Sequence, residues 1–225
     1  MCHMSCIVFG AKSIRREDVE GKRVIEVGSY DVNGSLRPLL TAWKPAEYVG
    51  SDIVSGPGVD LICEAEQLVA RFGEGRFDLV VCTEVLEHTR RWREVVHNLK
   101  HLVAPGGLLL VTTRGPGFAF HAWPNDFWRY DTEDFRRIFS DFETLALESD
   151  PEAPGVFAYL RRPASLDETD LSGIALTSML TGRREVDVTD ADFRNAYYQR
   201  ALRREKLRQT LGGMKLVLKK AVGLS

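Results

Sequence analysis

The chain has 225 residues, of which 44% are hydrophobic and 28% charged, and its formal net charge is −2. This is the composition of an ordinary globular protein with room for one α/β domain and an attachment, and the charge argues against wholesale binding to nucleic acid. Four cysteines are too few for a disulfide scaffold, and no apolar run approaches the ~20 residues that span a bilayer, so we expect a cytoplasmic protein.

Residues 1–20 form an N-terminal segment ahead of the periodic part of the chain. Cys2, His3 and Cys6 are three soft metal ligands, but no convincing fourth ligand accompanies them. A packed or disordered segment is the better interpretation, and we expect no metal site.

Strands alternate with helices across a core at residues 21–163. Strands are expected at 22–28, 47–53, 59–63, 77–83 and 107–113, with helices at 33–43, 65–72 and 92–103. A helix capped by Asp131 or Thr132 and two final strands, 142–149 and 155–162, complete the core. The alternation predicts an α/β fold with a doubly wound, mostly parallel sheet and helices on both faces.

The helix at 92–103 has the clearest apolar stripe in the chain. His97 and His101 fall off that stripe, so we expect both side chains to be exposed and without a role.

Polar residues follow four successive predicted strands, where ligands bind in such sheets. The first of these loops lacks G-x-G-x-x-G, because Tyr30 occupies the place of the second glycine. Singly, each feature has a bland explanation as a turn or a cap. Together they predict a nucleotide-type cofactor site, with Glu26, Gly28, Tyr30 and Gly34 after the first strand, Asp52 after the second, Glu64 and Ala65 after the third, and Thr83, Glu84 and His88 after the fourth.

Over roughly residues 20–162 the sequence resembles the class I S-adenosylmethionine-dependent methyltransferases. The resemblance rests on V-I-E-V-G, E-A-E-Q-L, F-D-L-V-V-C-T-E-V-L-E-H and L-V-A-P-G-G-L-L-L-V-T-T. It implies a Rossmann-like, seven-stranded sheet and S-adenosylmethionine as cofactor. Overall the chain looks like the stand-alone bacterial enzymes that methylate small molecules and sugars.

The resemblance also implies individual cofactor contacts. Glu26 and Gly28 would border the methionine portion, and Asp52 would bind the ribose hydroxyls with Ile53 flanking the adenine. Glu64 would accept from the adenine amino group, the Ala65 N–H would donate to the ring, and Thr83 and Glu84 would line the wall near the sulfonium. Tyr30 covers the methionine arm or packs on the surface.

The loop after the fifth predicted strand, F-A-F-H-A-W-P-N-D-F-W-R-Y, carries many large and charged side chains. His121 is the candidate general base, because an unperturbed histidine titrates near neutral pH. Asp126 orients His121 or acts as the base itself, and His88 is a second candidate. Substrate contacts are expected from Trp123, Trp128, Arg129 and Tyr130, by stacking on the rings and by clamping with the guanidinium. The alternative is a loop packed on the sheet edge, with Arg129 and Asp126 paired structurally.

Residues 164–225 read as a polar linker and a basic helical extension, with a helix expected at 190–211. From Arg194 onward there are nine Lys or Arg residues and one acidic residue. Three interpretations remain open: a helix packed on its own domain or on a second subunit, a surface for a membrane or an anionic carrier, and nucleic-acid binding. The last is the weakest, because no nucleic-acid module is recognisable.

The leading functional prediction is methyl transfer to a hydroxyl oxygen of a small molecule or sugar, in natural-product or surface-polysaccharide biosynthesis. A nicotinamide-dependent oxidoreductase is disfavoured by the missing G-x-G-x-x-G. A non-catalytic cofactor-binding or partner-binding protein is the third class. Methylation of nucleic acid at an exocyclic nitrogen is not expected, since no N-P-P-Y or D-P-P-Y follows the fourth strand.

Overall fold

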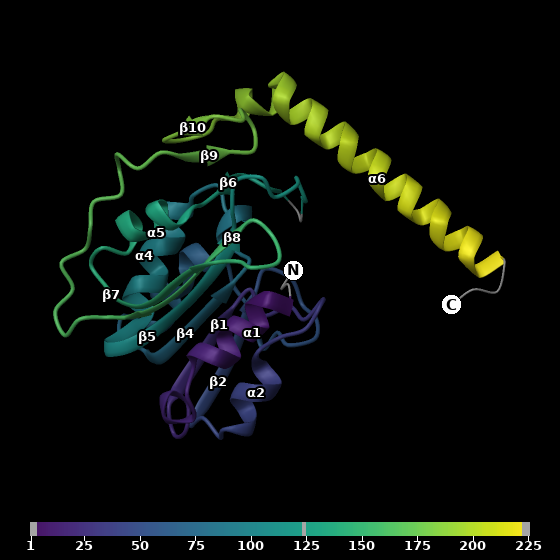
Figure 1. Ribbon diagram of the computed structural model, residues 1–225. Helices are drawn as coiled ribbons and strands as arrows, with labels where there is room; N and C mark the ends of the chain where they lie inside the picture. The colour runs from purple at the N-terminus through teal and green to yellow at the C-terminus, as the bar shows by residue number, and fades with distance from the viewer. Residues whose placement is uncertain (1–3, 123–124, 222–225) are drawn as a thin grey trace.

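A central sheet of seven strands organises the computed structural model, which describes residues 4–122 and 125–221 (Figure 1). Its order is β3-β2-β1-β4-β5-β8-β7, and the strands β3, β2, β1, β4 and β5 run parallel. β8 is antiparallel to both of its neighbours. The strand bounds are β1 Arg23–Val27, β2 Glu47–Asp52, β3 Leu61–Ile62, β4 Phe77–Thr83, β5 Val103–Arg114, β7 Glu143–Ser149 and β8 Gly155–Arg161. The predicted α/β, mostly parallel, seven-stranded fold is confirmed.

Helices cover both faces of this sheet (Figure 1). α1 (Met4–Ser13) and α2 (Arg37–Ala42) bury Cys6, Phe9 and Leu40 against one face. α3 (Leu68–Phe72), α4 (Trp92–Leu102) and α5 (Thr132–Ile138) bury the other. The N-terminal segment is therefore packed from Met4 onward, and Cys2 and His3 lie outside the described residues.

Helix boundaries follow local chemistry. Asp131 is the N-cap of α5, because its carboxylate accepts the Asp134 N–H at 2.8 Å. It is one of the two caps predicted from the sequence. The predicted helix at 65–72 is a 3₁₀ turn, η2 (Ala65–Gln67), followed by α3. Short 3₁₀ turns also occur as η1 (Arg16–Asp18) and η3 (Leu86–His88).

A second sheet joins the loop after β5 to residues beyond the predicted core. β6 (Trp128–Arg129), β9 (Leu176–Ser178) and β10 (Arg184–Glu185) pair antiparallel in the order β10-β9-β6. The segment predicted as a polar linker is thus folded onto the body, with five apolar side chains in the main core: Leu171, Ile174, Leu176, Leu180 and Val188. Its few apolar residues lack a regular period, which hid this packing from the sequence pattern.

The predicted C-terminal helix divides into the 3₁₀ turn η4 (Asp190–Arg194) and α6 (Ala196–Ala221). α6 projects from the body as a single long rod (Figure 1). Among the described residues, no helix combines the length and apolarity that a membrane crossing requires.

Candidate functional site

The loop after β1 opens the candidate site. At Gly28 the backbone φ is +77°, and a Cβ there would lie 2.2 Å from Val85 Cγ2, so no other residue fits. The Gly28 N–H donates to Ser51 O at 2.8 Å, and the Gly34 N–H donates to Asp31 Oδ1 at 2.8 Å. The loop therefore presents bare backbone at the carboxyl-end rim of the sheet.

Glu26 lies beneath this loop and is buried. Its carboxylate accepts hydrogen bonds from the Ser35 hydroxyl at 3.0 Å and the Tyr48 hydroxyl at 2.7 Å. Burial raises the pKa of Glu26, although the hydrogen bonds from Tyr48 and Ser35 lower it in part. These partners tie β1 to β2 and to the chain just before α2. The implied contact of Glu26 with a cofactor ammonium stays a prediction.

Asp52 ends β2 on the same rim. Its two carboxylate oxygens accept the Tyr30 N–H at 3.1 Å and the Val54 N–H at 3.3 Å. Ile53 beside it is half exposed. The Tyr30 ring lies on Gly56, where a Cβ would come within 2.2 Å of a ring carbon. The Tyr30 ring thus packs against a neighbouring loop, and its implied contact with the methionine arm stays a prediction.

Glu64 and Ala65 follow β3, beside Asp52. The Cys63 N–H donates to Asp52 O at 2.9 Å, and Glu64 is exposed apart from a 3.3 Å hydrogen bond from Gln67 Nε2. Accessible carboxylates suit the hydroxyls of a ribose, and the half-exposed Ile53 side chain suits an adenine ring. The glycine backbone allows a ligand to approach the main chain closely. The residues present therefore fit an adenosyl cofactor.

Glu84 does not fit its predicted place on the cofactor wall, although Thr83 ends β4 at the rim as expected. Glu84 has a φ of +58° and is buried in an ion pair with Arg114, while the Thr112 hydroxyl donates to it at 3.1 Å. Arg114 also pairs with Asp150 at 3.0 Å. Burial and the nearby Glu87 raise the pKa of Glu84, with Arg114 opposing them. The Cys6 thiol of α1 also donates to Glu84 Oε1 at 3.5 Å, so this carboxylate is held among buried partners.

Two histidines meet a carboxylate beyond β4, a set that we name the inner triad: Glu87, His88 and His121. Glu87 is fully buried, and its Oε2 accepts the Thr113 hydroxyl at 2.7 Å. Its Oε1 has no hydrogen-bond partner among the described residues and lies 3.9 Å from His88 Nε2 and 4.0 Å from His121 Nε2. The two rings stand edge to face with centroids 4.9 Å apart.

Hydrogen bonds at the far ring nitrogens set the tautomers of the inner triad. His88 Nδ1 lies 2.6 Å from Asn125 O, and His121 Nδ1 lies 3.2 Å from the Asp126 carboxylate. Each Nδ1 therefore carries the proton in a neutral ring, and both Nε2 lone pairs face Glu87. Burial lowers the pKa of His88, and Glu87 opposes that shift. Burial works to raise the pKa of Glu87, but the positive charge that the two imidazoles carry when protonated holds it below its usual value.

Three acceptors around one point can share protons, a water molecule or a metal ion, since their ligand atoms lie within 4.8 Å of one another. The sequence pattern did not bring these three residues together. Glu87 was missed as a site residue although it precedes His88 in L-E-H. Only the fold brings Glu87 beside both histidines, because His121 arrives from a distant loop.

Asp126 and Arg129 support His121. Arg129 donates two hydrogen bonds to Asp126, at 2.5 and 2.7 Å, and both side chains are buried. The Asp126 carboxylate also accepts the His121 N–H at 2.8 Å. Burial alone would raise the pKa of Asp126, but Arg129 and His121 lower it to about 2. Such a carboxyl is a poor base near neutral pH, so Asp126 orients His121.

Two predicted stacking residues are unavailable to a substrate. Trp128 and Tyr130 are fully buried, and they donate to Arg90 O and Leu86 O, each at 3.2 Å. The large rings of this segment therefore pack in the core, which agrees with the alternative interpretation of a loop packed on the sheet. Arg129 is likewise held by Asp126. Trp123 lies outside the described residues.

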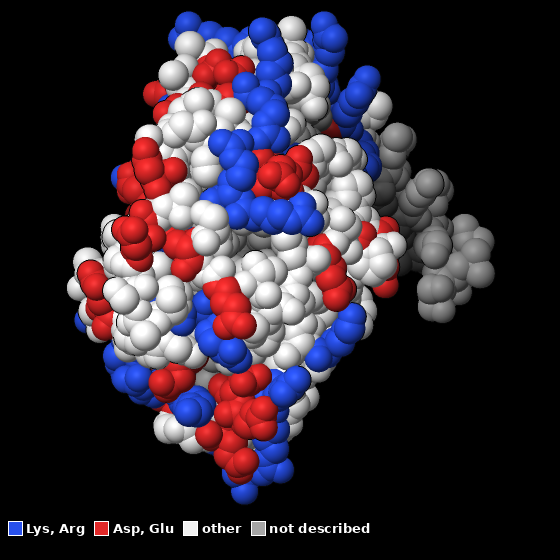
Figure 2. Space-filling model, turned by 60° about the vertical axis from the view of Figure 1, so that its left-hand side comes forward, with Lys and Arg blue, Asp and Glu red and all other residues white. Residues whose placement is uncertain are grey.

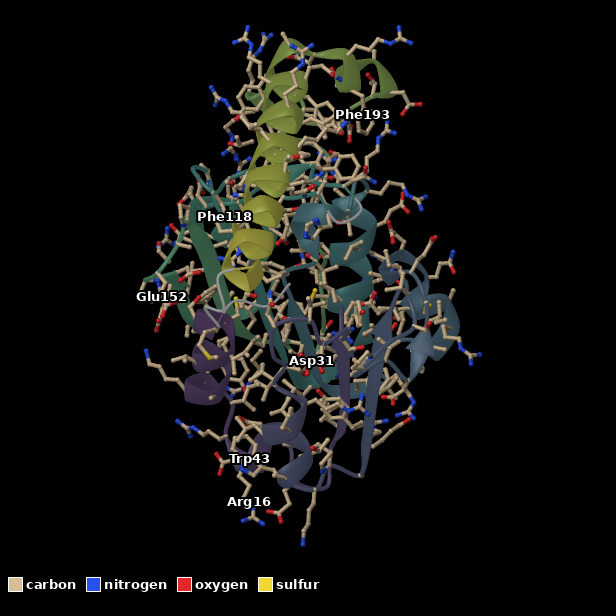
Figure 3. All side chains as sticks on the ribbon, turned by 90° about the vertical axis from the view of Figure 1, so that its right-hand side faces the viewer. Arg16, Asp31, Trp43, Phe118, Glu152 and Phe193 are labelled. Atoms are coloured by element: carbon tan, nitrogen blue, oxygen red, sulfur yellow. The ribbon has the colours of Figure 1, made fainter. Side chains whose placement is uncertain are left out.

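A cavity of about 460 Å³ lies between the loop after β5 and the first half of α6. Phe118 stands beside α6 in Figure 3 and forms part of one wall. Arg200, Arg204 and Arg208 line the opposite wall, with Glu205 among them. The cavity is therefore partly aromatic and predominantly cationic, and His121 follows its lining residues Phe118–Phe120 along the chain.

Residues 11–149 match the family model described as a methyltransferase domain. Among curated proteins, the ubiquinone biosynthesis O-methyltransferase of Chromobacterium violaceum is 30% identical over 112 residues, covering 44% of this chain and 47% of that protein. The protein of the same description from a Caulobacter species is 38% identical over 82 residues, covering 36% of this chain and 30% of that one. The chain thus spans about half, or less, of the curated relatives it matches.

Solved structures show the same fold at low identity. Magnesium protoporphyrin IX methyltransferase from Synechocystis, with bound S-adenosylmethionine, aligns with a TM-score of 0.52 at 19% identity, over 71% of this chain and 78% of that one. The 1,6-didemethyltoxoflavin N1-methyltransferase of Burkholderia thailandensis, with S-adenosylhomocysteine bound, gives 0.52 at 13% identity, over 72% and 77%.

Proposed function

Because this chain belongs to the methyltransferase-domain family and has the class I S-adenosylmethionine-dependent fold, we propose that it methylates a hydroxyl oxygen of a small anionic molecule. The observation that supports the choice of oxygen is the series of contacts from Arg129 to Asp126 to His121, which keeps the proton of a neutral His121 on Nδ1 and leaves Nε2 able to accept one. The curated relatives reported above bear the name O-methyltransferase, which is consistent with this choice.

The proposed cofactor seat uses the rim of β1, β2 and β3. S-adenosylmethionine, when bound, supplies a methyl group on a sulfonium that a nucleophile can displace in line. Asp52 would accept the ribose hydroxyls, Ile53 would cover an adenine face, and Glu64 would accept from the adenine amino group. Gly28 lets the main chain approach this ligand.

The inner triad would handle the proton. An alcohol or phenol needs a general base as it attacks, and His121 Nε2 is the base we assign. Asp126 keeps the ring in the tautomer that leaves Nε2 unprotonated, while Glu87 would stabilise the imidazolium that forms. His88 faces the same carboxylate from a more buried position and would share the proton.

The arginine-lined cavity favours an acceptor that carries a carboxylate or phosphate group. Three arginines at helical spacing on α6 face the loop that carries His121, and Glu205 offsets only part of their charge. A sugar phosphate, an aromatic acid or a phosphate-linked carrier has this chemistry. A peripheral membrane contact or a second subunit at α6 remains a further proposal for the same basic helix.

Two experiments test the function in order. Calorimetry should show heat of binding with S-adenosylmethionine and none with a nicotinamide dinucleotide, and the reverse result would make the chain an oxidoreductase. Release of S-adenosylhomocysteine is then measured with hydroxylated acceptors, each with and without a carboxylate or phosphate. Turnover that prefers the neutral member of every pair contradicts the anionic assignment.

The cofactor seat is tested by Gly28→Ala, with Gly73→Ala as its matched control. Both glycines have positive φ, but a Cβ at Gly73 meets nothing within 4 Å. We expect Gly28→Ala alone to lose binding of S-adenosylhomocysteine. Equal binding by the two variants would remove the rim from the site.

A further inference from the structure

His97, His101 and Glu168 form a second set of convergent ligands, which we name the outer triad. His97 Nδ1 lies 2.8 Å and His101 Nε2 lies 2.9 Å from the same oxygen, Glu168 Oε2. Their ligand atoms lie within 4.8 Å of one another. His97 is exposed as predicted, but the prediction is wrong for His101, whose side chain is only 17% exposed.

From these contacts we propose that the outer triad is a Zn²⁺ site. Histidines four residues apart lie on one face of a helix, a spacing that lets both rings bind one metal ion. Two imidazoles, one carboxylate and room for water suit Zn²⁺ among the common divalent ions. This site is independent of the function proposed above.

The second ring nitrogen of His101 also has a carboxylate nearby. Its Nδ1 lies 3.4 Å from Glu74 Oε2, while its Nε2 faces Glu168. A metal ion bound at Nε2 would leave the proton on Nδ1, directed toward Glu74, and a carboxylate in this position orients a metal-bound histidine.

The geometry needs only a small adjustment to admit the ion. Ligand distances of about 2.0–2.2 Å in a tetrahedral site place neighbouring ligand atoms roughly 3.3 Å apart. The observed separations of 2.8 and 2.9 Å are therefore short by about half an ångström. The Glu168 side chain is 27% exposed and has the freedom to retreat by that amount.

Neighbouring contacts hold Glu168 in place without the ion. The next residue, Thr169, donates its N–H to Asp141 at 3.1 Å, and its hydroxyl lies 2.8 Å from the Ser140 hydroxyl. Arg93, one turn before His97 on α4, donates to Leu171 O at 2.8 Å. The segment that carries Glu168 is therefore preorganised against α4.

The position of the outer triad indicates a structural role. His101 is in the last turn of α4, and its carbonyl accepts the Gly75 N–H at 2.7 Å just before β4 begins, at the rim opposite Gly28 and Asp52. An ion here would pin residues 163–175 to the core. That segment leads to β9, which pairs with β6 under the His121 loop. Figure 2 shows acidic and basic side chains interspersed over the face of the molecule that it presents.

The test is calorimetric titration of the metal-stripped full chain with Zn²⁺. Three proteins all carry His121→Ala, so that the inner triad lacks one ligand: this parent, the parent with Glu168→Gln, and the parent with Glu94→Gln. Glu94 is exposed on the same helix, outside the triad. We expect one Zn²⁺ per chain in the parent and in the Glu94 variant, and an affinity at least ten-fold weaker in the Glu168 variant. Equal affinity in all three overturns the site.

A second readout reports on the segment itself. Chymotrypsin can cut after Leu166 and Leu171, which flank Glu168. We expect Zn²⁺ to slow this cleavage several-fold in the parent and to leave the rate unchanged in the Glu168 variant. Protection that follows acidification and ignores Zn²⁺ would show an ion pair of protonated histidines only, and would overturn the proposal.

Discussion

The inner and outer triads share a plan in which two imidazoles face one carboxylate, and they differ in burial. Glu87 of the inner triad is fully buried, whereas Glu168 of the outer triad keeps 27% of its side chain exposed. In both, burial works to raise the pKa of the carboxyl and the imidazoles lower it below its usual value. The inner triad adds a buried charge network that fixes tautomers, which suits proton transfer. The outer triad has water access and side-chain freedom, which suit an ion that links two segments.

The largest expected effect is a loss of kcat, which we expect when the inner triad is changed and not when the outer triad is changed. His121→Ala should lower kcat by about 10²–10⁴-fold, since it removes the proposed base. Binding of S-adenosylhomocysteine should be unchanged, and added imidazole should restore part of the rate. Steady-state kinetics with calorimetry measure both quantities. Full turnover in this variant would remove His121 from the chemistry.

Removing Arg129 tests whether the burial of its ion pair with Asp126 determines how much the pair contributes to the unfolding free energy. Arg129→Ala leaves Asp126 as an unpaired buried charge and should cost about 3–5 kcal/mol of unfolding free energy. Arg136→Ala breaks an exposed pair with Glu133 and should cost no more than about 1 kcal/mol. Urea unfolding of both variants gives the comparison. Similar losses would mean that the Asp126 pair is not desolvated.

The Asp126 carboxyl should also make stability depend on acid. Its folded pKa of about 2 lies below the ordinary aspartate value, so its ionised form stabilises the fold above about pH 4, and this contribution disappears as the pH falls through 2. The shift corresponds to about 2–3 kcal/mol. Unfolding free energies at pH 5 and pH 2 should therefore differ less in Asp126→Asn than in the parent. An unchanged difference would contradict the low pKa.

Replacing the carboxylate of each triad, Glu87 or Glu168, should have smaller effects that again differ between the two triads. Glu87→Gln should lower kcat by roughly ten-fold, since the imidazolium loses its counter-charge in a buried site. Glu168→Gln without metal should change the unfolding free energy by less than about 1 kcal/mol, because a partly exposed pair contributes little. Kinetics and urea unfolding measure the two effects. A Glu87→Gln enzyme with normal kcat would leave the inner triad without a role in proton transfer.

Much of the fold and the cofactor rim could be predicted from local patterns. The parallel strands through β5, the stripe of α4 and the cap at Asp131 follow from hydrophobic period and capping chemistry. The order of polar residues after strands placed Gly28, Asp52 and Glu64 on one rim. The boundary at Val103 was less visible, because β5 begins there directly after α4 without a connecting loop.

The sequence by itself determined the sheet, the family and the candidate base, because these rest on residues that are close along the chain. Only tertiary structure decided which charges meet. It turned Glu84 toward Arg114, buried Trp128 and Tyr130, brought Glu87 to two histidines and folded the supposed linker into the core. The physical reason is that a carboxylate's chemistry depends on burial and on partners from distant segments, and neither is written in local spacing.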